Sequence, residues 1–234
     1  MRTRVLLAIM LLAIGGTGLV LAFPAAAAVA CPSCYGFAQD RDGLFVERST
    51  TPDQRRADED VVDAARTRVL AFYRTPLSHP RILLCSTEDC YARFGGRSRG
   101  LALLNVALFL SPRGTDVVIA AHELAHIELH SRIGLAKTMM KVVPQWFDEG
   151  LAVVVSNDPR YLATDRQGDR CLVEPQGDMP SGRAAWIQTA QNDQLYAKAA
   201  CRVSRWIGAH GGPQAIVEMT AAVARGEPFD SAAR

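Results

Sequence analysis

The sequence has no strong bias of charge, because its 26 lysines and arginines face 24 aspartates and glutamates. Arg2 and Arg4 are the only charged residues before Cys31, so the rest of the chain carries both signs in equal numbers. No basic patch is evident, which argues against a nucleic-acid-binding protein. No internal repeat is evident either, and low complexity is confined to AAAAVA, which excludes a fold built from repeated units.

The N-terminal segment lacks acids and carries a long apolar run. MRTR is followed by 19 residues without a charge, and an A-x-A step at Ala28–Ala30 precedes Cys31. These features are typical of a secretory signal. The run is also nearly long enough to cross a bilayer, so residues 1–30 are expected to be a cleaved signal peptide or a membrane anchor. Either way, residues 31–234 are expected outside the cytoplasm, in the periplasm or secreted.

Cysteines are few but even in number, and an even count in an exported chain favours disulfides. The favoured pairs are Cys31 with Cys34, Cys85 with Cys90, and Cys171 with Cys201. The CPSC segment leaves two alternatives open. A redox CxxC should start a helix after a buried strand, a context that is missing here. Lipid attachment at Cys31 would leave an odd number of thiols.

Apolar periodicity predicts strands in the first half of the chain and helices in the second, which favours an α+β domain. Strands are expected at 44–47, 81–85 and 101–111, the last with a kink at Asn105, and loops at 95–100 and 157–182. Helices are expected at 52–74, 115–134, 144–156, 184–209 and 213–226. Thr51 and Thr115 are expected to cap the first two helices. Residues 31–110 would then supply a helix and strands, and residues 111–234 the remaining helices.

Histidines are scarce, yet three of the five lie in HELAHIELH, residues 122–130. On a helix His122 and His126 leave one face a turn apart, so both imidazoles can bind one zinc ion. Glu123 lies about 100° round the helix, where it flanks the metal and reaches a bound water. This is the H-E-x-x-H pattern of zinc metalloproteases. The alternative is an ordinary polar helix face.

Catalytic zinc usually has three protein ligands and a water, so a third ligand is needed. The metzincin pattern fails, because Leu129 and Arg132 stand where it needs glycine and histidine. His130 lies one turn beyond His126, and ligands on three turns would spread about 12 Å, too far for one zinc ion. His130 is expected to support a ligand, line the cleft or be exposed. Glu128 and His130 are both expected to be bystanders to the metal.

Asp148 and Glu149, in the following helix, are the remaining candidates. HELAH followed by WFDEGLA resembles the gluzincins, zinc peptidases whose third ligand is a glutamate in a W-x-x-E-G-x-A context. The resemblance implies Glu149 as the ligand, Asp148 as its neighbour and zinc as the metal. It also implies a zincin-like domain, with a small mixed sheet packed on the HExxH helix and a helical lobe after it. Gly150 would let this helix approach a neighbour closely.

QLYAKAACRVSRW resembles the segment after the zinc helices of aminopeptidase-N-like enzymes, where a tyrosine stabilises the oxyanion. The resemblance implies that role for Tyr196, with Tyr161 as a competitor and a half-buried core tyrosine as the alternative. Those enzymes carry a Gly-x-Met-Glu-Asn stretch that grips the substrate's amino terminus, but residues 100–111 contain no acid. The strand there is expected to offer its edge to an extended peptide instead.

The expected function is therefore zinc-dependent hydrolysis of a peptide or protein substrate, with Glu123 as general base. Whether the enzyme cleaves internal bonds or removes N-terminal residues stays open. Two alternatives also stay open. One is an exported zinc-binding protein with a zincin fold and no catalytic activity. The other is an exported thiol–disulfide protein that uses Cys31 and Cys34.

Overall fold

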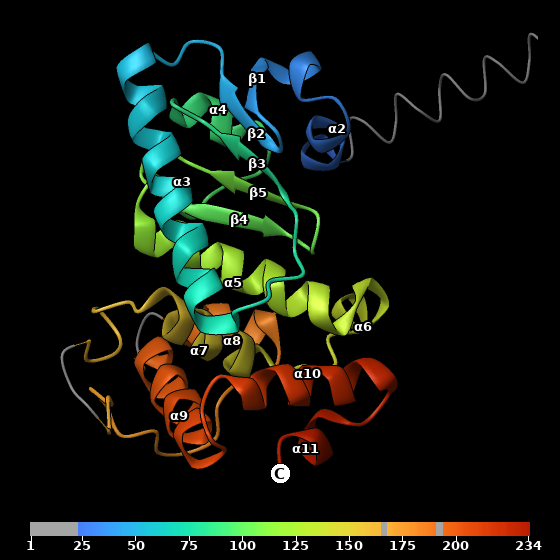
Figure 1. Ribbon diagram of the computed structural model, residues 1–234, viewed down its shortest axis with the longest axis vertical. Coiled ribbons are helices and arrows are strands. Elements are labelled where there is room, and N and C mark those ends of the chain that lie inside the picture. Colours follow the sequence, from blue (N-terminus) through green and yellow to red (C-terminus); the bar gives the residue numbers. More distant parts are fainter. Residues whose placement is uncertain (1–22, 165–167, 191–193) are drawn as a thin grey trace, which may run out of the picture.

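The computed structural model describes residues 23–164, 168–190 and 194–234 and confirms the α+β class (Figure 1). Its strands are β1 (Phe37–Arg41), β2 (Leu44–Glu47), β3 (Arg81–Leu84), β4 (Gly100–Leu103) and β5 (Ala107–Leu110). Its first helices are α2 (Pro24–Ala30), the 3-10 helix η1 (Pro32–Tyr35), α3 (Pro52–Tyr73), α4 (Glu88–Ala92) and α5 (Val117–Ile133). The rest are α6 (Leu135–Met140), α7 (Gln145–Ser156), α8 (Arg183–Thr189), α9 (Leu195–Ala209), α10 (Gln214–Arg225) and α11 (Phe229–Ala232).

The strands form one mixed sheet in the order β1-β2-β3-β5-β4. Its three middle strands run parallel, and the two edge strands are antiparallel to their neighbours. Residues of β3 alternate between two cores: Ile82 and Leu84 face the core shared with α3 and α5, whereas Leu83 packs with Phe94 and Phe109. Because both faces are covered, RILLC reads as a continuous apolar run.

The longest helix, α3, begins as the sequence predicts. Thr51 accepts a hydrogen bond from the backbone N–H of Gln54, and Pro52 occupies the first helical turn. Val62 and Val69 are buried along the side of α3 that faces the main core. Figure 1 shows α3 running beside the sheet and continuing past α5, so it joins the strand-rich and helical halves.

The prediction of one strand over 101–111 is wrong, because the segment folds into an antiparallel hairpin of β4 and β5. Leu104 takes a positive φ of 53°, and the N–H of Val106 donates to the carbonyl of Leu103. The turn lacks glycine and proline and lies between two apolar strands, so its one sequence signal is Asn105, where a kink rather than a turn is expected. The hairpin makes β4 an edge strand, next to α5 (Figure 1).

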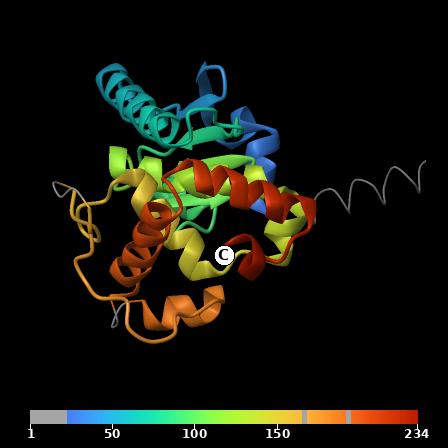
Figure 2. The same ribbon diagram turned by 60° about the horizontal axis from the view of Figure 1, so that its bottom comes forward.

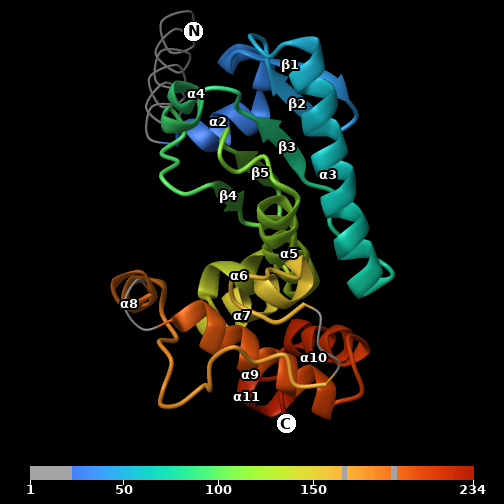
Figure 3. The ribbon, with the colours of Figure 1, turned by 90° about the vertical axis from the view of Figure 1, so that its left-hand side faces the viewer.

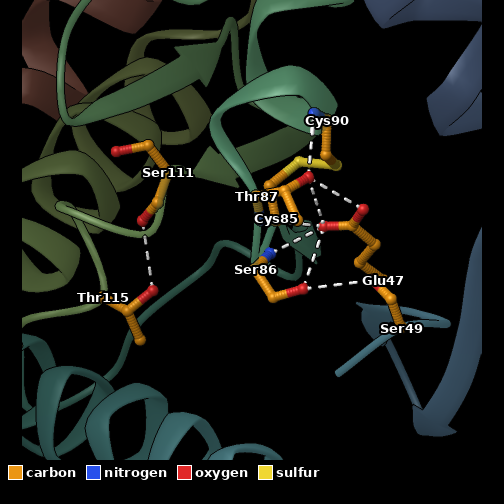
Figure 4. The surroundings of a disulfide bond; sticks show 8 residues. All are labelled: Glu47, Ser49, Cys85, Ser86, Thr87, Cys90, Ser111 and Thr115. Atoms are coloured by element: carbon orange, nitrogen blue, oxygen red, sulfur yellow. Dashed lines mark hydrogen bonds between the residues drawn. A yellow bond between two sulfur atoms is a disulfide. The ribbon is translucent and has the colours of Figure 1, made fainter. Parts of the chain in front are cut away.

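The predicted cap of α5 is also wrong, because Asp116 rather than Thr115 caps this helix. The Asp116 carboxylate accepts the N–H groups of Val118 and Ile119 at 2.8 and 3.2 Å. Thr115 instead donates its hydroxyl to the Ser111 carbonyl, one turn earlier (Figure 4). Both residue types are good caps, and the backbone path after β5 decides between them.

The helix predicted over 184–209 is two helices, α8 and α9, with residues 191–193 between them outside the described part of the chain. Gln194, with a φ of 52°, precedes the first residue of α9 and interrupts the helical path. Figure 2 shows α9, α10 and α11 together, and Trp186 of α8 packs against Leu195 and Ala199 of α9.

Glu128 lies outside the group of candidate metal ligands, as expected, and is a buried structural residue. Its carboxylate forms an ion pair with Arg132 at 2.8 Å and accepts the backbone N–H groups of Leu77 and Ser78. Arg132 also stacks over the Tyr73 ring. The pair therefore fastens the connection between α3 and β3 onto α5.

The six cysteines pair as the sequence favoured, in three disulfides. Around Cys85–Cys90, Glu47 at the end of β2 accepts hydrogen bonds from the backbone and hydroxyl groups of Ser86 and Thr87 (Figure 4). Thr87 in turn caps α4. The carboxylate and the disulfide together hold the connection that follows β3.

Most of the expected leader, residues 1–22, lies outside the described residues, so the choice between signal peptide and anchor stays a prediction. The AAAAVA segment belongs to α2, whose Ala28 is buried against the apolar cluster of Phe37 and Leu83. Across the described ranges, no helix combines the length and hydropathy needed to cross a bilayer.

Candidate metal centre

Three ligand atoms from two helices converge at one point. On α5, the Nε2 atoms of His122 and His126 lie 3.1 Å apart. Glu149 Oε2, from α7, lies 3.4 Å from His122 Nε2 and 3.6 Å from His126 Nε2. A tetrahedral zinc ion with bonds of 2.0–2.1 Å would hold its ligand atoms about 3.3 Å apart. The spacing of these three electron-pair donors therefore suits a single metal ion.

The position of α7 depends on a close approach between helices at Gly150. A Cβ atom there would come within 2.5 Å of the Ala199 carbonyl oxygen and 2.8 Å of Val203, both on α9. The two helices approach backbone to backbone at this point, which confirms the expected role of Gly150. Because Glu149 is the preceding residue, this contact fixes how far its carboxylate reaches toward α5.

Asp148 links two of the histidines. His126 Nδ1 donates to Asp148 Oδ1 at 2.5 Å, which leaves His126 Nε2 as the electron-pair donor that faces Glu149 and His122. His130 Nε2 lies 3.1 Å from the other carboxylate oxygen, and its Nδ1 donates to the Leu104 carbonyl at 3.1 Å. A carboxylate on the far nitrogen of a metal-binding histidine fixes the ring's tautomer and orientation.

The pKa values of the two acids follow from these contacts. Burial by itself would raise the pKa of Asp148, but the charges and hydrogen bonds of His126 and His130 hold it well below its usual range. Burial opposes ionisation of Glu149 too, yet hydrogen bonds with His122 and His126 lower its pKa to about 2. Both carboxylates are therefore ionised at neutral pH, the state that metal binding requires.

His126 shows the reciprocal effect. Burial acts to lower its pKa, and the Asp148 and Glu149 carboxylates outweigh burial and raise the pKa well above the usual value. Two acids and clustered imidazoles thus create a site that favours positive charge, whether a proton or a cation.

Glu123 lies on α5 beside the ligands and reaches the edge of the sheet. Its Oε2 accepts the backbone N–H of Ala102 on β4 at 3.1 Å. A Cβ atom on Gly100 would come within 2.5 Å of Glu123 Cγ, so the glycine provides space for this side chain. Glu123 thus stands between the metal ligands and the exposed strand edge.

Tyr196 and Tyr161 both line the cleft over the ligand cluster. The Tyr196 ring centroid lies 6.5 Å from that of His122, and Tyr161 stacks on Tyr196 at 5.1 Å. Trp186 meets Tyr196 edge to face on its other side. Burial, reinforced by the Glu149 charge, raises the pKa of Tyr196 to about 12. The phenol is therefore protonated at neutral pH and can donate a hydrogen bond.

The cleft has a volume of about 1240 Å³ and is lined from both halves of the molecule. β4 and the loop before it line one side, and residues of α6, α7 and α8 line the other. Figure 3 shows α8 and the green connection between α4 and β4 on the same side of the molecule. The volume exceeds that of most small-molecule sites, about 300–1,000 Å³.

All of the residues proposed from the sequence lie at this cleft: His122, Glu123, His126, Glu149, Tyr161 and Tyr196. The sequence did not reveal the contacts of Asp148 with His126 and His130, or the packing of Trp186 on Tyr196. Two features of the sequence could have indicated the contacts of Asp148. His130 follows His126 by four residues, on the same helix face, and Asp148 directly precedes the candidate ligand Glu149.

Comparison of the chain with models of known protein families, with curated proteins and with solved structures finds no match. The geometry of the cleft is accordingly the basis for the function.

Proposed function

We propose that the protein is a zinc-dependent peptidase of the gluzincin type, with a zincin-like arrangement of sheet and helices. The observation that carries the proposal is the convergence of His122, His126 and Glu149, whose ligand atoms lie 3.1 to 3.6 Å apart beside Glu123. Two imidazoles and one carboxylate are a donor set of catalytic zinc sites. Sites of this kind keep a fourth position for water or substrate, and the cleft gives access to it.

When bound, a zinc ion supplies a Lewis acid and lowers the pKa of a coordinated water to about 7. Glu123 accepts the proton of the attacking water and delivers it to the leaving amine. Tyr196, protonated at neutral pH, donates its hydroxyl to the oxygen that becomes negative during attack. Asp148 holds His126 in the tautomer that a metal ligand needs.

The edge of β4 supports an extended peptide as the substrate. The strand pairs with β5 on one side only, so its other edge can pair with a further strand. The Ala102 N–H, which donates a hydrogen bond to Glu123, points to the cleft side of this edge. A substrate aligned along β4 would pass directly over Glu123 and the three ligands.

We place this activity outside the cytoplasm, as the apolar leader predicts. Three disulfides support an oxidising compartment, because such bonds are rare in reducing ones. Attachment to a membrane through residues 1–30 remains a prediction.

Two variants of the full chain test the mechanism. Glu123→Ala should retain about one equivalent of zinc and lose hydrolysis of a peptide library by a factor of about 10² or more. His122→Ala should lose both zinc and hydrolysis, because it removes a ligand. Metal content is measured by atomic spectroscopy and cleavage by mass spectrometry. Glu218→Ala, at an exposed site on α10, is the matched control and should change neither.

Full activity of Glu123→Ala would contradict this mechanism. A wild-type protein that holds zinc and cleaves no library member would instead be a non-catalytic zinc-binding protein. Loss of activity in Cys31→Ser, with no effect of metal removal, would favour thiol–disulfide chemistry.

A further inference from the structure

The acidic and the basic side chains that line the cleft lie on different elements. Among the described lining residues, the acids are Glu123, Asp148 and Glu149, all at the ligand cluster. The lysines and arginines of the lining lie outside α5 and α7: Arg97, Lys137, Lys141 and Arg183. Apart from the acids of α5 and α7, the charged lining side chains that the structure describes are therefore all cationic, and we call these four the rim of the cleft.

These four cations come from both sides of the cleft. Arg97 lies in the connection between α4 and β4, on the sheet side. Lys137 is in α6, Lys141 is the residue that ends it, and Arg183 is the first residue of α8, all on the helical side (Figure 3). A peptide along β4 would pass between them, so side chains on either flank of it would meet positive charge.

Within the described ranges, none of the four cationic side chains has a hydrogen-bond or ion-pair partner. Several arginines outside the cleft are ion-paired: Arg41, Arg55 and Arg113 each pair with an acid, and Arg205 contacts two acids. Unpaired cations in a cleft attract an anionic ligand without first breaking an internal ion pair.

The acids of the ligand cluster do not cancel this charge. Asp148 is engaged by His126 and His130, and Glu149 contacts His122 and His126. A bound divalent cation would make the centre more positive still. Four cations thus face three acids in the described lining, before any metal charge is added, although the whole chain is nearly neutral at +2.

We propose that the substrate is an acidic peptide or an acidic segment of a protein, with Asp or Glu side chains on both sides of the cleaved bond. This inference rests on the proposed peptidase function, whose site it uses. Lys137 and Lys141 act on the helical side, and Arg97 on the sheet side. These residues contact the substrate's flanking side chains and take no part in proton transfer.

The test compares matched peptides on the full-length wild-type protein. A bond found to be cleaved in a peptide library is placed between flanks of Glu, of Gln or of Lys, with length and central residues unchanged. We expect kcat/KM to fall in the order Glu, Gln, Lys. Raising NaCl from about 0.05 M to about 0.5 M should shrink the advantage of the Glu peptide, since salt screens exposed charges.

A charge-reversal variant assigns the preference to the rim. The double substitution Lys137→Glu with Lys141→Glu should lower the Glu-to-Gln ratio of kcat/KM about tenfold. The milder pair Lys137→Gln and Lys141→Gln should lower the ratio less. Arg93→Glu with Arg225→Glu is the matched control, since both are exposed cations that do not line the cleft. The control should keep the wild-type ratio.

A binding measurement separates this inference from the catalytic proposal. Fluorescence anisotropy of labelled Glu and Gln peptides on Glu123→Gln reports charge preference without cleavage. Cleavage of peptides with equal rates for Glu and Gln flanks would overturn the acidic preference and leave the peptidase proposal standing. Tighter binding of the Glu peptide without any hydrolysis would overturn the peptidase proposal and leave an acidic-peptide binding cleft. An equal loss of ratio in the control variant would also overturn the rim assignment.

Discussion

At the scale of single residues, Asp148 is the side chain whose place in the site the sequence left least defined. It lies one position before Glu149, and the WFDEGLA motif implies only that it is the neighbour of a ligand. In the structure its two oxygens contact His126 and His130, and through His130 it is tied to the Leu104 carbonyl in the β4–β5 turn. One carboxylate thereby couples a proposed metal ligand to the hairpin that borders the cleft.

We expect Asp148→Asn to weaken zinc binding by about 10- to 100-fold, because the amide cannot hold His126 as a carboxylate does. Competition with a chromophoric chelator measures the affinity. Asp230→Asn, at an exposed position in α11, is the control and should leave the affinity unchanged. An unchanged affinity in Asp148→Asn would show that His126 is oriented without the carboxylate.

Tyr196 and Tyr161 compete for the role of oxyanion donor, and their stacking places both at the cleft. We expect Tyr196→Phe to lower kcat about 10²-fold with little change in KM, since the hydroxyl acts as charge develops. Tyr161→Phe should cost far less. Steady-state kinetics on one cleaved peptide gives both numbers. The reverse order of effects would assign the role to Tyr161.

At the scale of elements, α7 and α9 approach each other closely at Gly150. Gly150 on α7 leaves no space for a methyl group against Ala199 and Val203. Gly208 on α9 gives the opposite case, because a Cβ atom there meets nothing within 4 Å. Substituting alanine for each of these two glycines therefore separates two effects on stability. One is the loss of packing space, and the other is the loss of backbone freedom.

We expect Gly150→Ala to lower the free energy of unfolding by about 1–3 kcal/mol, because the helices must separate. The same variant should bind zinc more weakly, since Glu149 moves with the helix. Gly208→Ala should be neutral or stabilise the protein by about 0.5–1 kcal/mol. Urea unfolding compares the two. Similar effects at both sites would mean that α7 and α9 adjust to the added methyl.

At the scale of the whole molecule, the ligand set bridges two helices that the chain does not place together by itself. His122 and His126 belong to α5, while Glu149 belongs to α7, and α6 lies between them in the sequence. The main core unites α3, α5, α7 and α10, so the helices meet through shared apolar packing. The site exists only in the folded chain, which makes metal binding a source of stability.

We expect saturating zinc to raise the free energy of unfolding by about 4 kcal/mol when its free concentration is about 1,000 times the dissociation constant. Thermal unfolding of the full chain with zinc and with EDTA measures the shift. His122→Ala should show no shift, because it lacks a ligand. An equal shift in this variant would place the stabilising ion at another site.

The sequence by itself determined the helix that bears H-E-x-x-H and the α+β class, and it favoured the cysteine pairs that the structure contains. These follow from local spacing: four residues put two imidazoles on one helix face, and Pro52 after Thr51 starts a helix. The tertiary structure decided where the β4–β5 hairpin turns, that Asp116 caps α5, and that Glu128 is a buried structural acid. It also decided that Asp148 joins His126 to His130 and that four cations surround one cleft. The contacts of Glu128, of Asp148 and of the four cations join segments far apart in the chain, which no local pattern of residues specifies. The cap and the hairpin turn are local, but the backbone path around β5 decides between residues that suit either place.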